Sequence, residues 1–230
     1  MSDLPDFEPV KRKKVQDRVY QALKEALMGG KFSPGRPLTI NELATAFGTS
    51  TMPVREALSR MSASGALVVH ANRSICVPEI SAEEFADLCR VRRLVEGQAA
   101  AWATPRIPRA DMTELDDLIA RMDNAIRAHS MDDFFALNHA FHFLIYRASG
   151  SEVLLPLIEN LWLMAGPYLS LLYHRGRLRA NQTHHHALRS ALAKQDADGA
   201  RAAIAADLQE AAMVVIKMFR ISGDPDCPAP

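Results

Sequence analysis

The stretch LTINELATAFGTSTMPVREALSRMSASGALVV, residues 38–69, predicts two short helices followed by a strand. The first helix is expected to end at Gly48, because glycine favours the turn that follows a helix. Ser50 is the predicted N-cap of the second helix, which runs to Gly65 and places Pro53 in its first turn, where a missing N–H is tolerated. Two helices joined by a tight turn are typical of a helix-turn-helix.

The flanking sequence extends this motif to a winged helix-turn-helix. Apolar residues between positions 11 and 29 recur at three- and four-residue spacing, which predicts a preceding helix. Thr39 and Glu42 have the spacing of a capping box at the start of the next helix. The β-prone runs ALVVH and SICVP flank ANR, as in a hairpin. Residues 11–79 therefore form a predicted DNA-binding domain, preceded by a flexible tail over residues 1–10.

The charge of the chain is divided unevenly although its net formal charge is zero. Residues 9–78 hold 11 Lys and Arg against 4 Asp and Glu, whereas the remainder holds 16 basic against 23 acidic residues. A basic first third indicates a nucleic-acid module attached to a domain of another kind. Lys13, Lys14 and their basic neighbours are expected to neutralise phosphates and to make binding steeply dependent on salt, the alternative being a merely soluble tail.

The chain after Pro78 is predicted to be helical throughout, without strands. Ser81 and Glu84 have capping-box spacing at the first of these helices. Six helices are predicted, over residues 81–103, 109–128, 130–150, 151–177 with a bend near Pro156, 181–194 and 197–219. The predicted fold class is mainly α, an N-terminal winged helix-turn-helix plus a C-terminal all-α bundle of about six helices. Residues 80–220 form this second domain, and residues 221–230 form a disordered tail.

Composition excludes several classes of protein. No apolar run approaches the roughly 20 residues of a transmembrane helix. No apolar signal-peptide core follows the N-terminal methionine, so export is not expected. The three cysteines, Cys76, Cys89 and Cys227, are odd in number and lack CxxC spacing, which suits a reducing cytoplasm better than a disulfide framework. The sequence thus predicts a cytoplasmic protein that does not bind a membrane.

The second helix of the motif has the residues that a recognition helix needs. A helix in the major groove requires polar or basic residues in its first turns and a small N-cap that can approach phosphate, as Ser50, Thr51 and Arg55 provide. Its opposite face carries apolar residues that can pack inward: Val54, Ala57, Leu58 and Met61. The guanidinium of Arg55 can pair with guanine through two hydrogen bonds. A solvated arginine on an exposed helix is the alternative interpretation.

The whole of residues 38–69, and PVREAL above all, resembles the winged helix of the GntR family of transcription regulators. Members of that family usually have a second arginine where this chain has Thr51. The operator sequence of this protein is therefore expected to differ from theirs. It also implies that the wing residues His70, Asn72 and Arg73 face the minor groove or the DNA backbone. Arg73 at a hairpin tip is otherwise an ordinary soluble turn residue.

The helical remainder resembles the FCD-type ligand-binding domain of the FadR-like branch of this family. The resemblance rests on VRRLVEG, NHAFHFLIYRASGS and HHHALRSALAKQDADGARAAIAADL. It implies a divalent metal, held here by Asn138, His142, His185 and Asp207, with Asn138 replacing a usual carboxylate and Asp207 a usual histidine. Zinc, nickel or manganese suits such an oxygen and nitrogen set. His184 and His186 should point away if His185 points inward, because adjacent helical residues diverge by about 100°.

Arg92 is the predicted effector-binding residue. The resemblance implies that an arginine at this position binds a carboxylate effector near the metal, and a cation plus a metal in an apolar cavity favours a small organic acid. A surface salt bridge with Glu96, four residues further on, is the alternative. The family also implies a homodimer that reads two half-sites of a pseudo-palindrome, and we expect a repressor that its effector releases from DNA.

Two other function classes remain open at the level of sequence. Histidines in a helical bundle suggest a metalloenzyme, but the chain has neither an HExxH motif nor the paired ExxH motifs of a di-iron site. An effector-independent DNA-binding protein is the other alternative. A cavity closed by apolar side chains at the predicted site would favour it.

Overall fold

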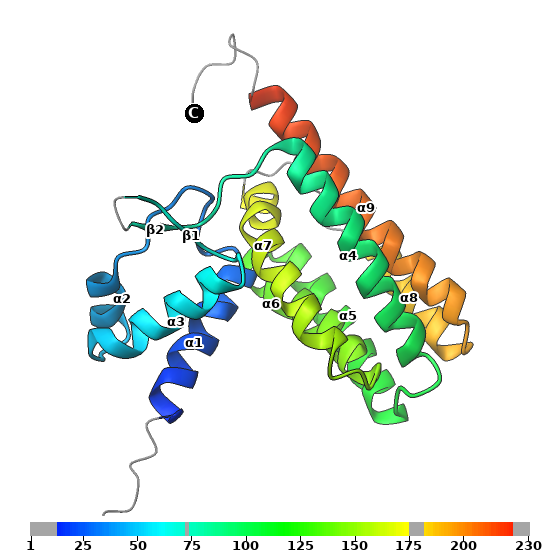
Figure 1. The fold of residues 1–230 in the computed structure, drawn as a ribbon. Coiled ribbons are helices and arrows are strands. Elements are labelled where there is room, and N and C mark those ends of the chain that lie inside the picture. The colour runs from blue at the N-terminus through cyan, green and yellow to red at the C-terminus, as the bar shows by residue number, and fades with distance from the viewer. Residues whose placement is uncertain (1–12, 72–73, 175–181, 223–230) are drawn as a thin grey trace, which may run out of the picture.

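The computed structural model describes residues 13–71, 74–174 and 182–222. Within these ranges the chain forms nine helices and one short hairpin, with a small N-terminal unit on one side of a helical bundle (Figure 1). The predicted fold class is confirmed. No helix in the described ranges is both long and apolar enough to cross a bilayer.

The N-terminal unit has the predicted order of a winged helix-turn-helix. Its elements are α1 (Lys13–Met28), α2 (Ile40–Ala46), α3 (Thr51–Ala63), β1 (Val68–Val69) and β2 (Ile75–Cys76). Gly48 and Gly65, with φ of 59° and 77°, follow α2 and α3 in the left-handed region that glycine adopts most easily. The hairpin is antiparallel and pairs Val68 with Cys76. The α1 helix packs on α3 through buried side chains that include Leu23 and Leu58.

The bundle contains the remaining helices. They are α4 (Ala82–Ala103), α5 (Arg109–Arg127), α6 (Met131–Ala148), α7 (Leu154–His174), α8 (Thr183–Ala193) and α9 (Ala197–Ser222). The long helices α4 and α9 lie side by side, and α5 packs on α6 and α8 on α9 (Figure 1). Phe134, Phe141 and Phe143 of α6 fill the core between them. Six helices are present where the sequence predicted them, and most bounds differ by a few residues; the predicted end at 177 and the predicted start at 181 lie outside the described residues.

The two predicted capping boxes have different outcomes. At α4 the box is formed: the backbone N–H of Glu84 donates to Oγ of Ser81 (3.1 Å), and the N–H of Ser81 donates to the Glu84 carboxylate (2.7 Å). At α2 the prediction is wrong, because the hydroxyl of Thr39 donates to the carboxylate of Glu42 instead of accepting a backbone hydrogen bond. The two side chains bond to each other there, and neither caps the backbone at the start of α2.

The sequence predicted a bend near Pro156 within a longer helix, but α7 begins only at Leu154. Pro156 therefore lies in the first turn, where backbone N–H groups have no intrahelical partner. The hydroxyl of Ser151 accepts from the backbone N–H of Leu154 (3.1 Å) and caps this start. The proline inside the described part of α7 is Pro167.

The α7 helix connects the bundle to the N-terminal unit. Nζ of Lys24 in α1 lies 2.7 Å from Oε2 of Glu159 in α7. Nδ2 of Asn160 donates to the backbone oxygen of Ser64, just after α3 (2.9 Å). Gly166 lies so close to α1 that a Cβ atom there would be 2.6 Å from the carbonyl oxygen of Leu27. Small and polar residues of α7 thus fix its position against the N-terminal unit.

Candidate functional site

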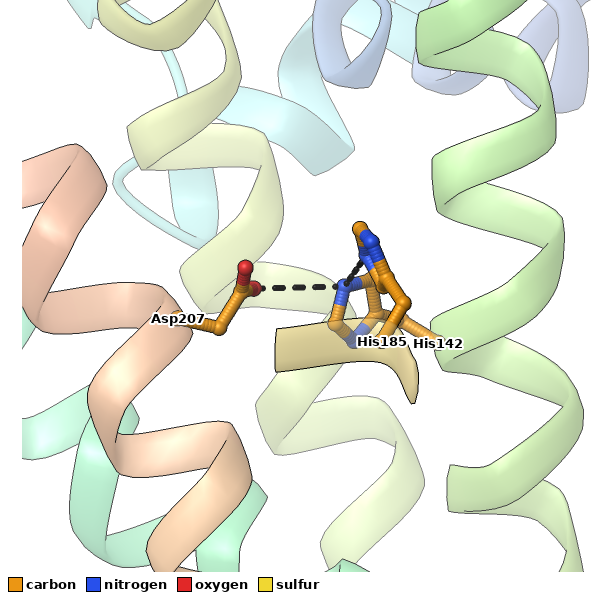
Figure 2. A group of neighbouring side chains, drawn as sticks. All are labelled: His142, His185 and Asp207. Carbon is orange, nitrogen blue, oxygen red and sulfur yellow. Dashed lines mark hydrogen bonds and ion pairs between the residues drawn. The ribbon is translucent and has the colours of Figure 1, made fainter. Parts of the chain in front are cut away.

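Three predicted metal ligands from three helices meet at a cavity of the bundle (Figure 2). They are His142 of α6, His185 of α8 and Asp207 of α9. Nε2 of His142 lies 3.4 Å from Oδ2 of Asp207 and 3.3 Å from Nε2 of His185. Their ligand atoms all lie within 4.8 Å of one another.

The cavity has a volume of about 60 Å³ and a mixed lining. Its polar wall contains Arg92, Asn138, His184 and Glu210 beside the three residues above. Its apolar wall contains Trp162, Phe134, Phe135, Leu169, Leu208 and Ala211. Asn138, the fourth predicted ligand, is thus at the cavity, one helical turn before His142. A lining this polar does not favour the effector-independent alternative.

A fully buried carboxylate organises the wall of the cavity. Glu96 of α4 accepts hydrogen bonds from Nε of Arg92 (2.7 Å), from the hydroxyl of Tyr146 (2.6 Å) and from Nε1 of Trp162 (2.9 Å). The oxygen of Tyr146 also lies 3.2 Å from Nδ1 of His142. Since the hydroxyl proton goes to Glu96, the tyrosine oxygen can only accept from His142, so Nδ1 carries the proton. Nε2 of His142 is then the ring nitrogen that faces the site.

The protonation states of the other two groups also suit a metal. Burial lowers the pKa of His185 to about 4. Burial raises the pKa of Asp207, but the hydrogen bond and charge of His142 outweigh it and lower the pKa to about 2. At neutral pH the pair therefore offers a neutral imidazole and a carboxylate, the forms that bind metal.

Two separations in the donor set have the length expected between ligands of a divalent metal. Ligands about 2.1 Å from a tetrahedral metal lie roughly 3.4 Å apart. The separations of 3.3 and 3.4 Å around Nε2 of His142 agree with that value. Lone pairs of His142 and His185 that face each other without a proton or a cation between them would repel. Within the described residues, Nδ1 of His185 is buried without a partner, so the contact with Nε2 of His142 is the one polar contact that orients this ring.

Arg92 lies at the cavity and forms the salt bridge with Glu96, but that pair is not on the surface as the alternative interpretation expected. The residue is only 1% exposed, so its salt bridge with Glu96 is buried and not on the surface. Burial lowers the pKa of Arg92, but the Glu96 carboxylate outweighs this effect and raises it above the usual value. The guanidinium also lies 5.1 Å from the ring of Trp162. Arg92 is therefore charged and fixed in position.

The other histidines near the site lie apart from the cluster of His142, His185 and Asp207, although one of them lines the cavity. His186 is exposed, as expected. His184, expected to point away, lines the cavity and lies 2.8 Å from a carboxylate oxygen of Glu210. His139 stacks on Phe143 at 4.2 Å between ring centres, and burial lowers its pKa to about 4. None of the three joins the cluster around His142.

Sequence reasoning missed three residues of the site: Glu96 as a structural carboxylate, Tyr146 and Trp162. Two of them carried a signal. Tyr146 follows His142 by four residues, a spacing that places both on one helical face, as does the spacing of Arg92 and Glu96. Trp162 comes from another helix at a distance of 66 residues from Glu96, and no local pattern could have predicted that contact.

The recognition helix α3 presents its predicted polar face to solvent. Thr51 and Arg55 are exposed, whereas the residues predicted to pack inward are buried: Val54, Ala57, Leu58 and Met61. Ser50 occupies the N-cap position, and its hydroxyl makes no cap hydrogen bond with the described backbone. His70 on the wing is exposed.

The remaining residues predicted to contact DNA lie either outside the described residues or at the start of α1. Asn72 and Arg73 lie outside the described residues. Lys13 and Lys14 open α1, which places them at the start of the N-terminal unit.

The fold and this exposed helix define the class of DNA-binding transcription regulators. Comparison with known proteins gives the family: residues 15–77 match the model of bacterial regulatory proteins of the gntR family, and residues 87–210 match the FCD domain. The chain belongs to the GntR family and carries an FCD domain.

Individual relatives agree with this assignment. The chain is 31% identical to the HTH-type transcriptional regulator McbR of Escherichia coli K12 over 205 residues, 88% of this chain and 93% of McbR. It is 26% identical to the HTH-type transcriptional repressor RspR of the same strain over 197 residues, 85% and 86% of the two chains. The solved structure of E. coli McbR/YncC has a TM-score of 0.84 at 30% identity and covers 90% of this chain and 99% of its own. The protein is a transcription regulator and not an enzyme.

Proposed function

We propose that this regulator is a repressor whose affinity for double-stranded operator DNA is controlled by a small carboxylate effector bound beside a divalent metal. In this proposal residues 11–79 bind DNA, and residues 80–220 bind the effector and form a homodimer. Because its partner is operator DNA, its place of action is the cytoplasm. The name of the relative RspR supports repression. The observation that carries the proposal is the convergence of His142, His185 and Asp207 at a polar cavity.

The metal of this proposal is zinc, nickel or manganese. Two imidazole nitrogens, the Asp207 carboxylate and the amide oxygen of Asn138 would hold it. When bound, it supplies a positive charge that binds an anionic oxygen. The chain itself holds His142 in the required tautomer through Tyr146 and Glu96.

The cavity limits the effector to a very small acid. One water requires about 10–15 Å³ of such volume, so 60 Å³ admits an organic acid of about four to six non-hydrogen atoms. A guanidinium has five N–H donors, and Glu96 accepts from only two of the nitrogens of Arg92, so donors remain for a carboxylate. We therefore expect an acid of two to four carbons, bound by Arg92 and the metal.

The α7 helix is the route by which effector binding would reach the DNA-binding unit. Trp162 in its middle contacts the site through Glu96, and its ring lies 5.6 Å from the ring of His142. Glu159 and Gly166 of the same helix contact α1. An effector that displaces Trp162 would shift α7 against α1, to the extent that it binds one of the two arrangements more tightly.

The homodimer of this proposal uses the outer face of α4. Val91, Leu94 and Trp102 follow one another at helical spacing and are 37%, 70% and 43% exposed. Residues at these spacings form one stripe along the helix. An apolar stripe that meets its own copy across a two-fold axis forms a self-complementary interface, which would place two recognition helices on two half-sites.

The test is a thermal-melt screen of tag-free, chelator-treated full-length protein with zinc, nickel or manganese. Each metal is added alone and with a panel of carboxylic acids of two to four carbons. We expect one metal to raise the melting temperature, and one acid to raise it further while weakening binding to DNA selected from a randomised duplex pool. His185→Ala should abolish the rise, whereas His186→Ala, a neighbour on the exposed face, should keep it. An equal rise in both variants, or no metal response at all, would refute the metal site.

A further inference from the structure

The exposed face of the recognition helix carries one large apolar side chain beside its polar residues. Met52, the second residue of α3, is 54% exposed. Its neighbour Thr51 and the next residue of the same helical row, Arg55, are exposed as well. The buried face of α3 does not include Met52, because Val54, Ala57, Leu58 and Met61 form it within the core of the N-terminal unit.

The place of Met52 in the helix is the part that enters the major groove. In helix-turn-helix proteins the N-terminal residues of the second helix contact the base edges. Met52 lies three residues before Arg55, which is about 4.5 Å along the helix axis. Base pairs are stacked at about 3.4 Å, so the two side chains face base pairs that are one or two steps apart.

The chemistry of a methionine restricts what it can recognise there. A thioether has neither a strong donor nor a charge, and it makes favourable contacts with apolar groups. The C5-methyl group of thymine is the apolar group that base edges present in the major groove. A methionine pressed against polar edges instead would desolvate them without a hydrogen bond.

We infer that Met52 is a specificity-determining residue that contacts the methyl group of a thymine, with the methyl of Thr51 beside it. Each operator half-site should therefore contain a thymine one or two steps from the base pair that Arg55 contacts. This inference uses the DNA-binding unit alone and is independent of the metal and the effector. The methionine supplies selectivity that the threonine at position 51 provides only weakly.

The experiment begins with duplexes selected from a randomised pool by the full-length wild-type protein. Each thymine of the selected half-site is replaced in turn by uracil, which removes only the methyl group. At one position per half-site we expect the affinity of the wild type to fall about fourfold, the effect of one buried methyl group. Met52→Ala should bind the two duplexes equally, and Met52→Leu should restore the preference for thymine.

Two controls distinguish this contact from other causes. Met213→Ala removes an equally exposed methionine from α9 and should keep the full penalty for uracil. Melting temperatures of the Met52 variants should equal that of the wild type, because the side chain is exposed. The inference is overturned if uracil weakens wild type and Met52→Ala equally at every position, if no thymine is sensitive, or if Met52→Ala selects the same half-site from the pool.

Discussion

Glu96 is the single residue on which the stability of the cavity depends most. Its carboxylate is fully buried and accepts from Arg92, Tyr146 and Trp162. A charge buried this deeply is tolerated only when an opposite charge and several hydrogen bonds replace water. The same carboxylate fixes the hydroxyl that orients His142. One side chain thus combines structural and functional roles.

Glu96→Gln should lower the free energy of unfolding by about 3–5 kcal/mol, because it leaves Arg92 buried without its countercharge. Chemical denaturation measures the loss. Asp87→Asn is the matched control on the same helix. It breaks an exposed pair with Arg90 and should change stability by less than about 1 kcal/mol. Equal losses in the free energy of unfolding would show that the buried pair contributes no more to stability than the exposed pair.

Tyr146→Phe removes the hydroxyl that accepts from Nδ1 of His142 and should weaken metal binding about 10- to 100-fold. Burial and Glu96 raise the pKa of this hydroxyl, so the loss should not depend on pH between 6 and 8. Competition with a chromophoric chelator measures the affinity. Tyr168→Phe removes a hydroxyl that donates to the backbone oxygen of Pro78, away from the cavity, and should leave metal affinity unchanged.

The sequence predicted the ligand positions better than their environment. His142, His185 and Asp207 were placed by resemblance to the family, and helical geometry confirms their convergence. The burial of Arg92 was not predicted, since the spacing of Arg92 and Glu96 is the same for an exposed and for a buried pair. The pair is buried because α6, α7 and α9 all pack against α4, and that tertiary packing is not visible in the spacing.

At the scale of single elements, α7 has the strictest requirement for a small residue. Gly166→Ala would place Cβ 2.6 Å from the carbonyl oxygen of Leu27, which belongs to rigid helical backbone. We expect a loss of about 1–3 kcal/mol in stability and weaker coupling between bundle and DNA-binding unit. Denaturation and operator binding are the measurements.

Gly97→Ala is the matched control for this substitution. Gly97 also lies within a helix, but the nearest atom to its Cβ position is Cγ of the flexible Arg201, at 3.1 Å. Moving the Arg201 side chain aside costs some stability, whereas alanine stabilises a helix relative to glycine, so the two effects should nearly cancel. A Gly166 variant as stable as the Gly97 variant would show that α7 can move away from α1 freely.

Element boundaries were predicted well because they follow from local rules. Glycines and N-cap serines ended or began helices where the structure has them. The rules failed where two local interactions competed, as at Thr39, whose hydroxyl bonds the Glu42 side chain. The spacing of a capping box cannot distinguish these two outcomes, because both use the same pair of residues.

At the scale of the whole molecule, Leu94→Glu should convert the proposed dimer to a monomer. The substitution places two carboxylates at the centre of an apolar interface, where burial of charge is strongly unfavourable. Sedimentation velocity measures the mass. Val15→Glu, which changes an exposed apolar residue of α1, should leave the dimer intact. A dimeric Leu94 variant would exclude the stripe of α4 from the interface.

The placement of the two units was beyond prediction from sequence. The contacts of Lys24 with Glu159 and of Leu27 with Gly166 join residues far apart in the chain. Neither pair lies in a motif, and a glycine within a helix usually indicates only a weak point of that helix. The order of the elements, in contrast, followed from the helical spacing before the hairpin, the β-prone runs ALVVH and SICVP, and the helical pattern after Pro78.

The basic N-terminal unit lies on one side of an acidic bundle, so positive and negative charge are separated across the molecule (Figure 1). In the field of a DNA duplex we expect such a molecule to turn its basic N-terminal unit toward the duplex before contact. A larger fraction of the diffusional encounters with DNA then has the orientation needed for binding. The search for an operator becomes faster in dilute salt without any change in the contacts that hold the final complex.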